Sequence, residues 1–194
     1  MLLTAGHLSS QMLVHILLMN AVAPLIALAL RHRWADPAGL RGWLFLAMSA
    51  QLVLLWAWHS PPALDAAARS QALHLAMQAS LLICAIWFWS AVFFVRDDGR
   101  WKPIVALLLT SKLFCLLGVL LVFAPRLLYP DLLAAHGEHA LPATLADQQL
   151  AGLLMLVACP ATYVLAGIVI AARWFGDMDA ADTADLAPEA RRAV

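Results

Sequence analysis

Histidine, methionine and glutamine recur at helical spacing in this chain, and they are the residues whose types could do chemistry. His7, Gln11 and His15 are spaced i, i+4, i+8, and Met12 and Met19 flank them at helical spacing. An imidazole suits copper, zinc, iron or nickel, whereas the soft thioether of methionine selects Cu(I). This first stripe therefore indicates a site that handles copper.

Two later stretches carry similar stripes. His74, Met77 and Gln78 are spaced i, i+3, i+4 and share one helix face. The third face is made up of Gln148, Gly152, Met155 and Cys159. A glycine in such a face permits close approach of another helix. Polar side chains inside a membrane normally face the interior of the bundle, so we expect the three stripes to face each other.

The predicted metal site combines these stripes with His59. A loop of about fourteen residues joins His59 to His74 and can bring both to the level of His15. The remaining predicted ligands are Met77, Met12, Met155 and His7. Metal-bound histidines commonly need a partner on the second ring nitrogen. The residues predicted to surround the ligands are Asp147, Gln148, Gln11 and Gln78. No carboxylate lies within the stripes, which argues against Ca²⁺, Mg²⁺ or Mn²⁺.

The amino-acid composition is typical of an integral membrane protein. Hydrophobic residues make up 64% of the 194 residues and charged residues only 12%, about half the charged share of a soluble domain. The 12 basic and 12 acidic residues cancel, so nothing indicates a nucleic-acid partner. The three cysteines are too scattered for a disulfide framework.

Five apolar stretches are long enough, or nearly so, to cross a bilayer, which takes about 20 residues per helix. They cover residues 11–30, 43–58, 72–95, 104–124 and 149–174. The predicted fold is thus all-α, a polytopic membrane bundle of five transmembrane helices in residues 1–175. An Ala/Asp-rich tail, residues 176–194, is expected to be disordered.

The basic residues predict the orientation of the bundle. Nine of them fall on one side, in two loops and the tail: Arg31, Arg33, Arg41, Arg96, Arg100, Lys102, Arg173, Arg191 and Arg192. The opposite loops hold only Arg69 and Arg126. Because positive residues stay inside, we expect an outer N-terminus and a cytoplasmic C-terminus. Six of the seven histidines then lie at or near the outer face, and only His32 is cytoplasmic.

Lys112 is an exception, because it is a charged residue in the middle of the fourth stretch. A lysine at that depth needs a polar partner or a path for water. No acidic residue lies in any stretch. We expect a polar neighbour such as Gln51 or Asn20, or a water-filled cavity.

Three motifs resemble those of the multi-spanning CtaG family of cytochrome c oxidase assembly proteins. The first is Gln11–His15 with Leu17–Met19 and Ala23-Pro24. The second is Trp58–Pro62 with Asp65–Ala67 and Leu73-His74. The third is Asp147–Met155, a polar start to an apolar helix. The resemblance covers His7 to Trp174, nearly all of the predicted membrane part.

The resemblance implies an accessory protein of a bacterial inner membrane rather than an enzyme. It would hold or deliver copper as Cu(I) at the periplasmic face for cytochrome c oxidase subunits, with a periplasmic copper chaperone as a further partner. Three alternatives stay open. They are a copper transporter, a haem-binding membrane protein with two axial histidines, and a scaffold without metal.

Overall fold

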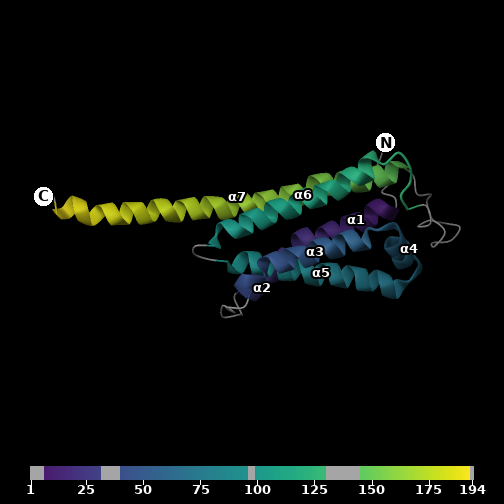
Figure 1. The fold of residues 1–194 in the computed structure, drawn as a ribbon, viewed down its shortest axis with the longest axis horizontal. Helices are drawn as coiled ribbons and strands as arrows, with labels where there is room; N and C mark the ends of the chain where they lie inside the picture. The colour runs from purple at the N-terminus through teal and green to yellow at the C-terminus, as the bar shows by residue number, and fades with distance from the viewer. Residues whose placement is uncertain (1–6, 32–39, 96–98, 130–144, 193–194) are drawn as a thin grey trace.

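The computed structural model describes residues 7–31, 40–95, 99–129 and 145–192, and every regular element in these ranges is a helix. The long helices lie side by side (Figure 1). The all-α class predicted from the sequence is therefore confirmed. Within these described ranges, four stretches are long and apolar enough to cross a membrane: Leu8–Arg31, Gln71–Phe94, Trp101–Phe123 and Leu145–Ala180.

The second predicted span is a bent pair of helices. After a short 3-10 turn, η2 (Leu40–Trp43), helix α3 (Leu44–Trp58) has 15 residues, about 22 Å at ~1.5 Å per residue against a core of ~30 Å. Helix α4 (Pro61–Arg69) then turns away by 73°, and only the two together could make a fifth span. A proline forces the preceding residue out of the helical region, and Ser60 is extended (φ −65°, ψ 140°). His59 lies in the break.

The first span contains a π-helical turn. It consists of α1 (His7–Leu17), η1 (Leu18–Val22) and α2 (Ala23–Arg31). In η1 the amide of Ala23 bonds to the carbonyl of Leu18, five residues back. The next carbonyl, that of Met19, would need the amide of Pro24, which has no hydrogen. The indole Nε1 of Trp89 donates to this carbonyl at 3.0 Å instead, so this backbone acceptor is paired, as the membrane interior requires.

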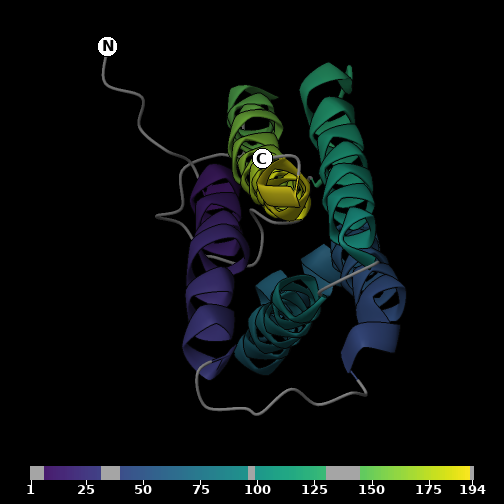
Figure 2. The same ribbon diagram turned by 90° about the vertical axis from the view of Figure 1, so that its left-hand side faces the viewer.

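Three longer helices complete the bundle: α5 (Gln71–Phe94), α6 (Trp101–Phe123) and α7 (Leu145–Arg192). Helix α6 packs along α7, α5 packs against α2 and α3, and α1 packs against α7 (Figure 2). Buried aromatic rings of Phe88, Trp89, Phe114 and Tyr163 meet in the middle. The start of α1, the end of α3 and the start of α7 lie together, and we call this part the histidine end (Figure 1).

The backbone of the tail differs from the disorder that we expected for residues 176–194. Helix α7 continues past the bundle as far as Arg192 (Figure 1). The residues beyond Gly176 include Ala180, Ala181, Ala184, Ala187 and Ala190. Alanine has the highest helix propensity of the residues, which explains why helical backbone extends beyond the last apolar turn.

Lys112 does not have the polar neighbour that we expected. The amide of Gln51 donates instead to the hydroxyl of Tyr163 at 2.8 Å, and Asn20 is buried beside a cavity at the histidine end. Lys112 lies on the exposed side of α6. The expectation was wrong because α6 turns its small and polar face, with Thr110, Ser111 and Gly118, toward the bundle instead.

Candidate metal centre

Two histidine rings meet at the histidine end of the bundle. His15 comes from α1 and His59 from the break between α3 and α4, and their ring centroids are 5.8 Å apart at an interplanar angle of 67°. The residues are only 3% and 4% exposed. Two imidazoles in such a dry setting need hydrogen-bond partners or a ligand for their four nitrogens.

In each ring, Nδ1 is hydrogen-bonded to the backbone carbonyl oxygen of the residue four positions earlier. Nδ1 of His15 lies 2.7 Å from the carbonyl oxygen of Gln11, and Nδ1 of His59 lies 2.7 Å from that of Leu55. A carbonyl oxygen can only accept a hydrogen bond, so each Nδ1 carries the proton. In a neutral ring, Nε2 then has a free lone pair. Metal-binding histidines have this arrangement, in which a backbone carbonyl fixes the tautomer.

Among the described residues, no donor satisfies the two Nε2 atoms. Nε2 of His15 is buried and without a hydrogen-bond partner. Nε2 of His59 lies 3.2 Å from the sulfur of Met12. With Nδ1 as the donor, both members of this contact are lone-pair donors, so the contact is not a hydrogen bond in the neutral ring. Two nitrogen lone pairs and a thioether sulfur thus lie close together, which fits a soft metal ion.

A small cavity joins these ligand atoms. It measures about 10 Å³, close to the space that one water molecule needs. Its lining is Met12, His15, Ile16, Met19, Asn20, Leu55, His59, Phe114, Met155 and Cys159. Three thioethers, a thiol and two imidazoles are present without a carboxylate. That donor set suits Cu(I) and not a hard cation.

The sequence-predicted ligands divide into two groups. His15, His59, Met12 and Met155 line the one cavity. Met77 is fully buried, and Gln78 and His74 are half-buried on α5, but this stripe is not part of the lining. Within the described ranges no three side chains of His, Cys, Asp or Glu form a metal-binding group. His74 lies near enough to His15 to interact with it electrostatically, but it is not among the residues that line the cavity.

The segment between His59 and His74 explains why His74 does not line the cavity. We expected a loop that folds back, but residues 61–69 form helix α4, which leaves α3 at 73°. The side chain of His7, at the first position of α1, and both His136 and His139 lie outside what the structure describes. Met19 and Cys159 belong to the predicted stripes, yet sequence reasoning did not include them among the ligands.

Two of the residues predicted to surround the ligands, Asp147 and Gln148, form hydrogen bonds with backbone groups. A carboxylate oxygen of Asp147 accepts from the amide of Leu8 at 3.0 Å, and the other accepts from that of Ser9 at 3.2 Å. Asp147 on α7 thus caps the start of α1, where it also complements the helix dipole. Gln11 contributes its carbonyl to His15. Neither Asp147 nor Gln148 bonds to Nδ1 of His15 or His59.

Gln148 and Tyr129 fasten the chain that follows α6. The amide of Leu128 donates to Oε1 of Gln148 at 2.8 Å, and Nε2 of Gln148 donates to the carbonyl of Leu121 at 3.1 Å. Tyr129 donates its hydroxyl to the carbonyl of His59 at 2.7 Å. Burial, with the nearby Asp65 carboxylate, raises the pKa of Tyr129 to about 12, so this donor keeps its proton at physiological pH. No spacing in the sequence indicated this contact.

We expect Asp147→Ala to lower the free energy of unfolding by about 1 kcal/mol, the usual cost of losing a helix cap. The measurement is denaturant unfolding of the purified protein in detergent. Asp177→Ala is the matched control, because its exposed pair with Arg100 is expected to contribute less than about 1 kcal/mol. Equal stability of wild type and Asp147→Ala would contradict the capping role.

The fold and the site together describe a class of protein. It is an all-helical membrane protein with a buried histidine–methionine cluster near one end. The family model of the cytochrome c oxidase caa3 assembly factor (Caa3_CtaG) matches residues 2–177. The chain therefore belongs to this family of assembly factors, which confirms the resemblance noted from the motifs. No curated protein and no solved structure matches the chain.

Proposed function

We propose that this protein holds a Cu(I) ion between His15, His59 and Met12 and passes it to a cytochrome c oxidase during assembly. The observation that carries the proposal is the pair of Nε2 lone pairs beside a thioether sulfur. Met155, Met19 and Cys159 line the same cavity and supply further soft ligands. The family supports a non-catalytic accessory role in oxidase assembly.

The site would release copper by ligand exchange with a receiving protein. Cu(I) accepts few ligands, so two imidazoles and a thioether can hold it while a receiving protein offers others. The backbone carbonyls of Gln11 and Leu55 keep both rings in the tautomer that exposes Nε2. Cap and fastening contacts by Asp147 and Tyr129 hold α1 and His59 in position. The metal, the partner subunits and any periplasmic chaperone belong to this proposal.

Three alternatives fit the cavity less well. A haem needs far more room between its axial histidines than about 10 Å³. A transport pathway needs polar groups through the full membrane depth, whereas this cavity gathers them at one end. A scaffold without metal would leave the buried Nε2 of His15 unexplained.

The outer location of the site has its own test. With nine basic residues on one side and two on the other, we expect the histidine end to face the periplasm of a bacterial inner membrane. A cytoplasmic reporter fused after Asp98 should be active, and a periplasmic reporter fused after Glu138 should be active. The reverse pattern would place the copper site on the cytoplasmic face and contradict delivery from outside.

The function itself is tested in cells that lack the native gene for this protein. Wild type and His74→Ala are expected to restore the copper content and activity of the oxidase, and His59→Ala is expected to fail. Protein level in the membrane is the control for each variant. Full oxidase copper content with His59→Ala would contradict the proposed function.

A further inference from the structure

A large cavity lies at the end of the bundle opposite the histidines. It has a volume of about 840 Å³ and lies between α2, α5 and α7. Helix α1 packs on α7, but after the π-helical turn and Pro24 the chain packs on α5 instead. The cavity is the space that this divergence leaves.

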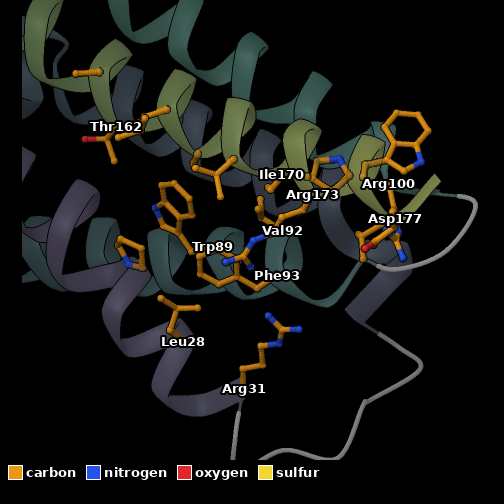
Figure 3. Close-up of a pocket in the computed structure, with 18 residues that line it drawn as sticks. Leu28, Arg31, Trp89, Val92, Phe93, Arg100, Thr162, Ile170, Arg173 and Asp177 are labelled. Atoms are coloured by element: carbon orange, nitrogen blue, oxygen red, sulfur yellow. The ribbon is translucent and has the colours of Figure 1, made fainter. Parts of the chain in front are cut away.

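The wall of the cavity is apolar and reaches the membrane-facing surface. Val92 and Phe93 of α5 and Ile170 of α7 line it (Figure 3), as do Ala166 and Val169 of α7. Leu165 and Val169 are 63% and 44% exposed. A hydrocarbon chain from the bilayer can therefore enter between α2 and α7.

Arginines give one end of this cavity a positive charge. Arg31 ends α2, Arg173 lies on α7, and Arg100 precedes α6 (Figure 3). Arg100 is paired with Asp177, the only acidic residue among the described residues of the lining. Within the described residues, no ion pair joins Arg31 or Arg173 to an acid. Two guanidinium groups are thus free, and guanidinium matches the geometry of a phosphate.

We propose that this cavity binds an anionic phospholipid. Its acyl chains lie against the apolar wall, and its phosphate pairs with Arg31 and Arg173. Basic pockets between helices at a membrane surface recognise such headgroups. A zwitterionic lipid could fill the wall but adds no net negative charge to match the arginines. The proposal is independent of copper binding, because it concerns the other end of the bundle.

Native mass spectrometry of the full-length, delipidated protein tests the proposal with added phosphatidylglycerol or phosphatidylcholine. Phosphatidylglycerol is expected to bind more tightly. Each arginine near a membrane surface contributes a factor of about five, so Arg31→Gln/Arg173→Gln should weaken its binding about 25-fold. The binding of phosphatidylcholine should weaken less, because its choline cation offsets the charge of the phosphate. Arg126→Gln, an exposed arginine near the histidine end, is the matched control and should have no effect.

A second variant tests the apolar wall. Ala166→Trp fills the cavity and should reduce the binding of both lipids. Equal binding of the two lipids by the wild type, or undiminished phosphatidylglycerol binding by the double variant, would overturn the proposal. A photo-crosslinker at Leu165 is expected to label lipid. Labelling of a protein helix there instead would also overturn it.

The position of Lys112 supports a second inference, which does not depend on the lipid site. It is the middle residue of α6 (Trp101–Phe123), about 16 Å from either end at ~1.5 Å per residue. It is exposed among leucines that are exposed too, Leu108, Leu109, Leu113 and Leu116. On a lipid-facing helix this position would hold a lysine near the bilayer centre, where charge is costly without a partner.

We also infer that this face of α6 docks a transmembrane helix of a different protein, with an Asp or Glu at mid-membrane depth. The partner is not a second copy of this chain. Residues 8–31, 44–58, 71–94, 101–123 and 148–174 contain no acidic residue. Lipid phosphates lie too far away, near the ends of α6. A carboxylate on a neighbouring helix would pair the lysine within the membrane.

A photo-crosslinker at Leu116 in cells tests this docking face. The expected adduct is a helix with a mid-membrane carboxylate, and Lys112→Met should lower its yield about ten-fold. Lys112→Arg should retain the adduct, and Lys102→Met, at the first turn of α6, is the matched control without effect. Adducts with lipid or a second copy alone, or an unchanged yield in Lys112→Met, would overturn the inference.

Discussion

Replacing His59 with alanine is expected to weaken Cu(I) binding by more than about 100-fold, because loss of an outer hydrogen-bond partner alone costs 10–100-fold. The substitution removes one of the two Nε2 ligands and the neighbour of the Met12 sulfur. Cu(I) affinity is measured by competition with a chromophoric chelator under reducing conditions. His15→Ala should have a similar effect, since its Nε2 lines the same cavity.

His74→Ala is the matched control for this experiment. His74 lies at the same end of the bundle, half-buried on α5, but outside the lining of the cavity. We expect its loss to change Cu(I) affinity less than about 10-fold, the lower limit for residues that support a ligand. An equal loss of affinity in His59→Ala and His74→Ala would contradict a site centred on His15 and His59. The loss would then indicate the three-histidine site first predicted from the sequence.

The second large effect is expected at Gly152. A Cβ at this position would lie 2.7 Å from the carbonyl oxygen of Gly118 and 2.9 Å from Cβ of Leu121. These are atoms of α6 that no rotamer change can move. Gly152→Ala therefore forces α6 and α7 apart, and we expect a loss of about 2 kcal/mol in the free energy of unfolding.

Gly167→Ala on the same helix is the control for Gly152→Ala. No atom lies within 4 Å of a Cβ built at Gly167, so alanine there should leave stability unchanged or raise it by up to ~1 kcal/mol through helix propensity. Denaturant unfolding in detergent measures both variants. Equal stability of the two would show that α6 and α7 are not in contact at Gly118 and Gly152.

Local spacing predicted much of the site. Met12, His15 and Met19 share a face of the first span, and Met155 and Cys159 share a face of α7, because a helix repeats every 3.6 residues whatever surrounds it. The sequence also predicted that Gly152 allows close packing, which the short distance to Gly118 confirms. These features depend on one helix and its nearest neighbour.

Other features depend on tertiary packing, which no spacing encodes. Pro61 and Pro62 predict a break, but not that α4 turns away by 73° and leaves His74 outside the cavity. Asp147 was predicted to orient a histidine, and no spacing indicated that its carboxylate accepts two amides at the start of α1. The outward direction of Lys112 follows from which face of α6 meets α7 at Gly118, and that choice needs both helices together.

X-ray absorption spectroscopy of the copper-loaded, reduced full-length protein tests the central claim most directly. The site predicts one Cu(I) bound by two imidazole nitrogens and at least one sulfur, and Met12→Leu should lower the sulfur contribution to the spectrum while both imidazoles stay. A copper shell of nitrogen or oxygen alone in the wild type, or a shell unchanged by His15→Ala/His59→Ala, would contradict it.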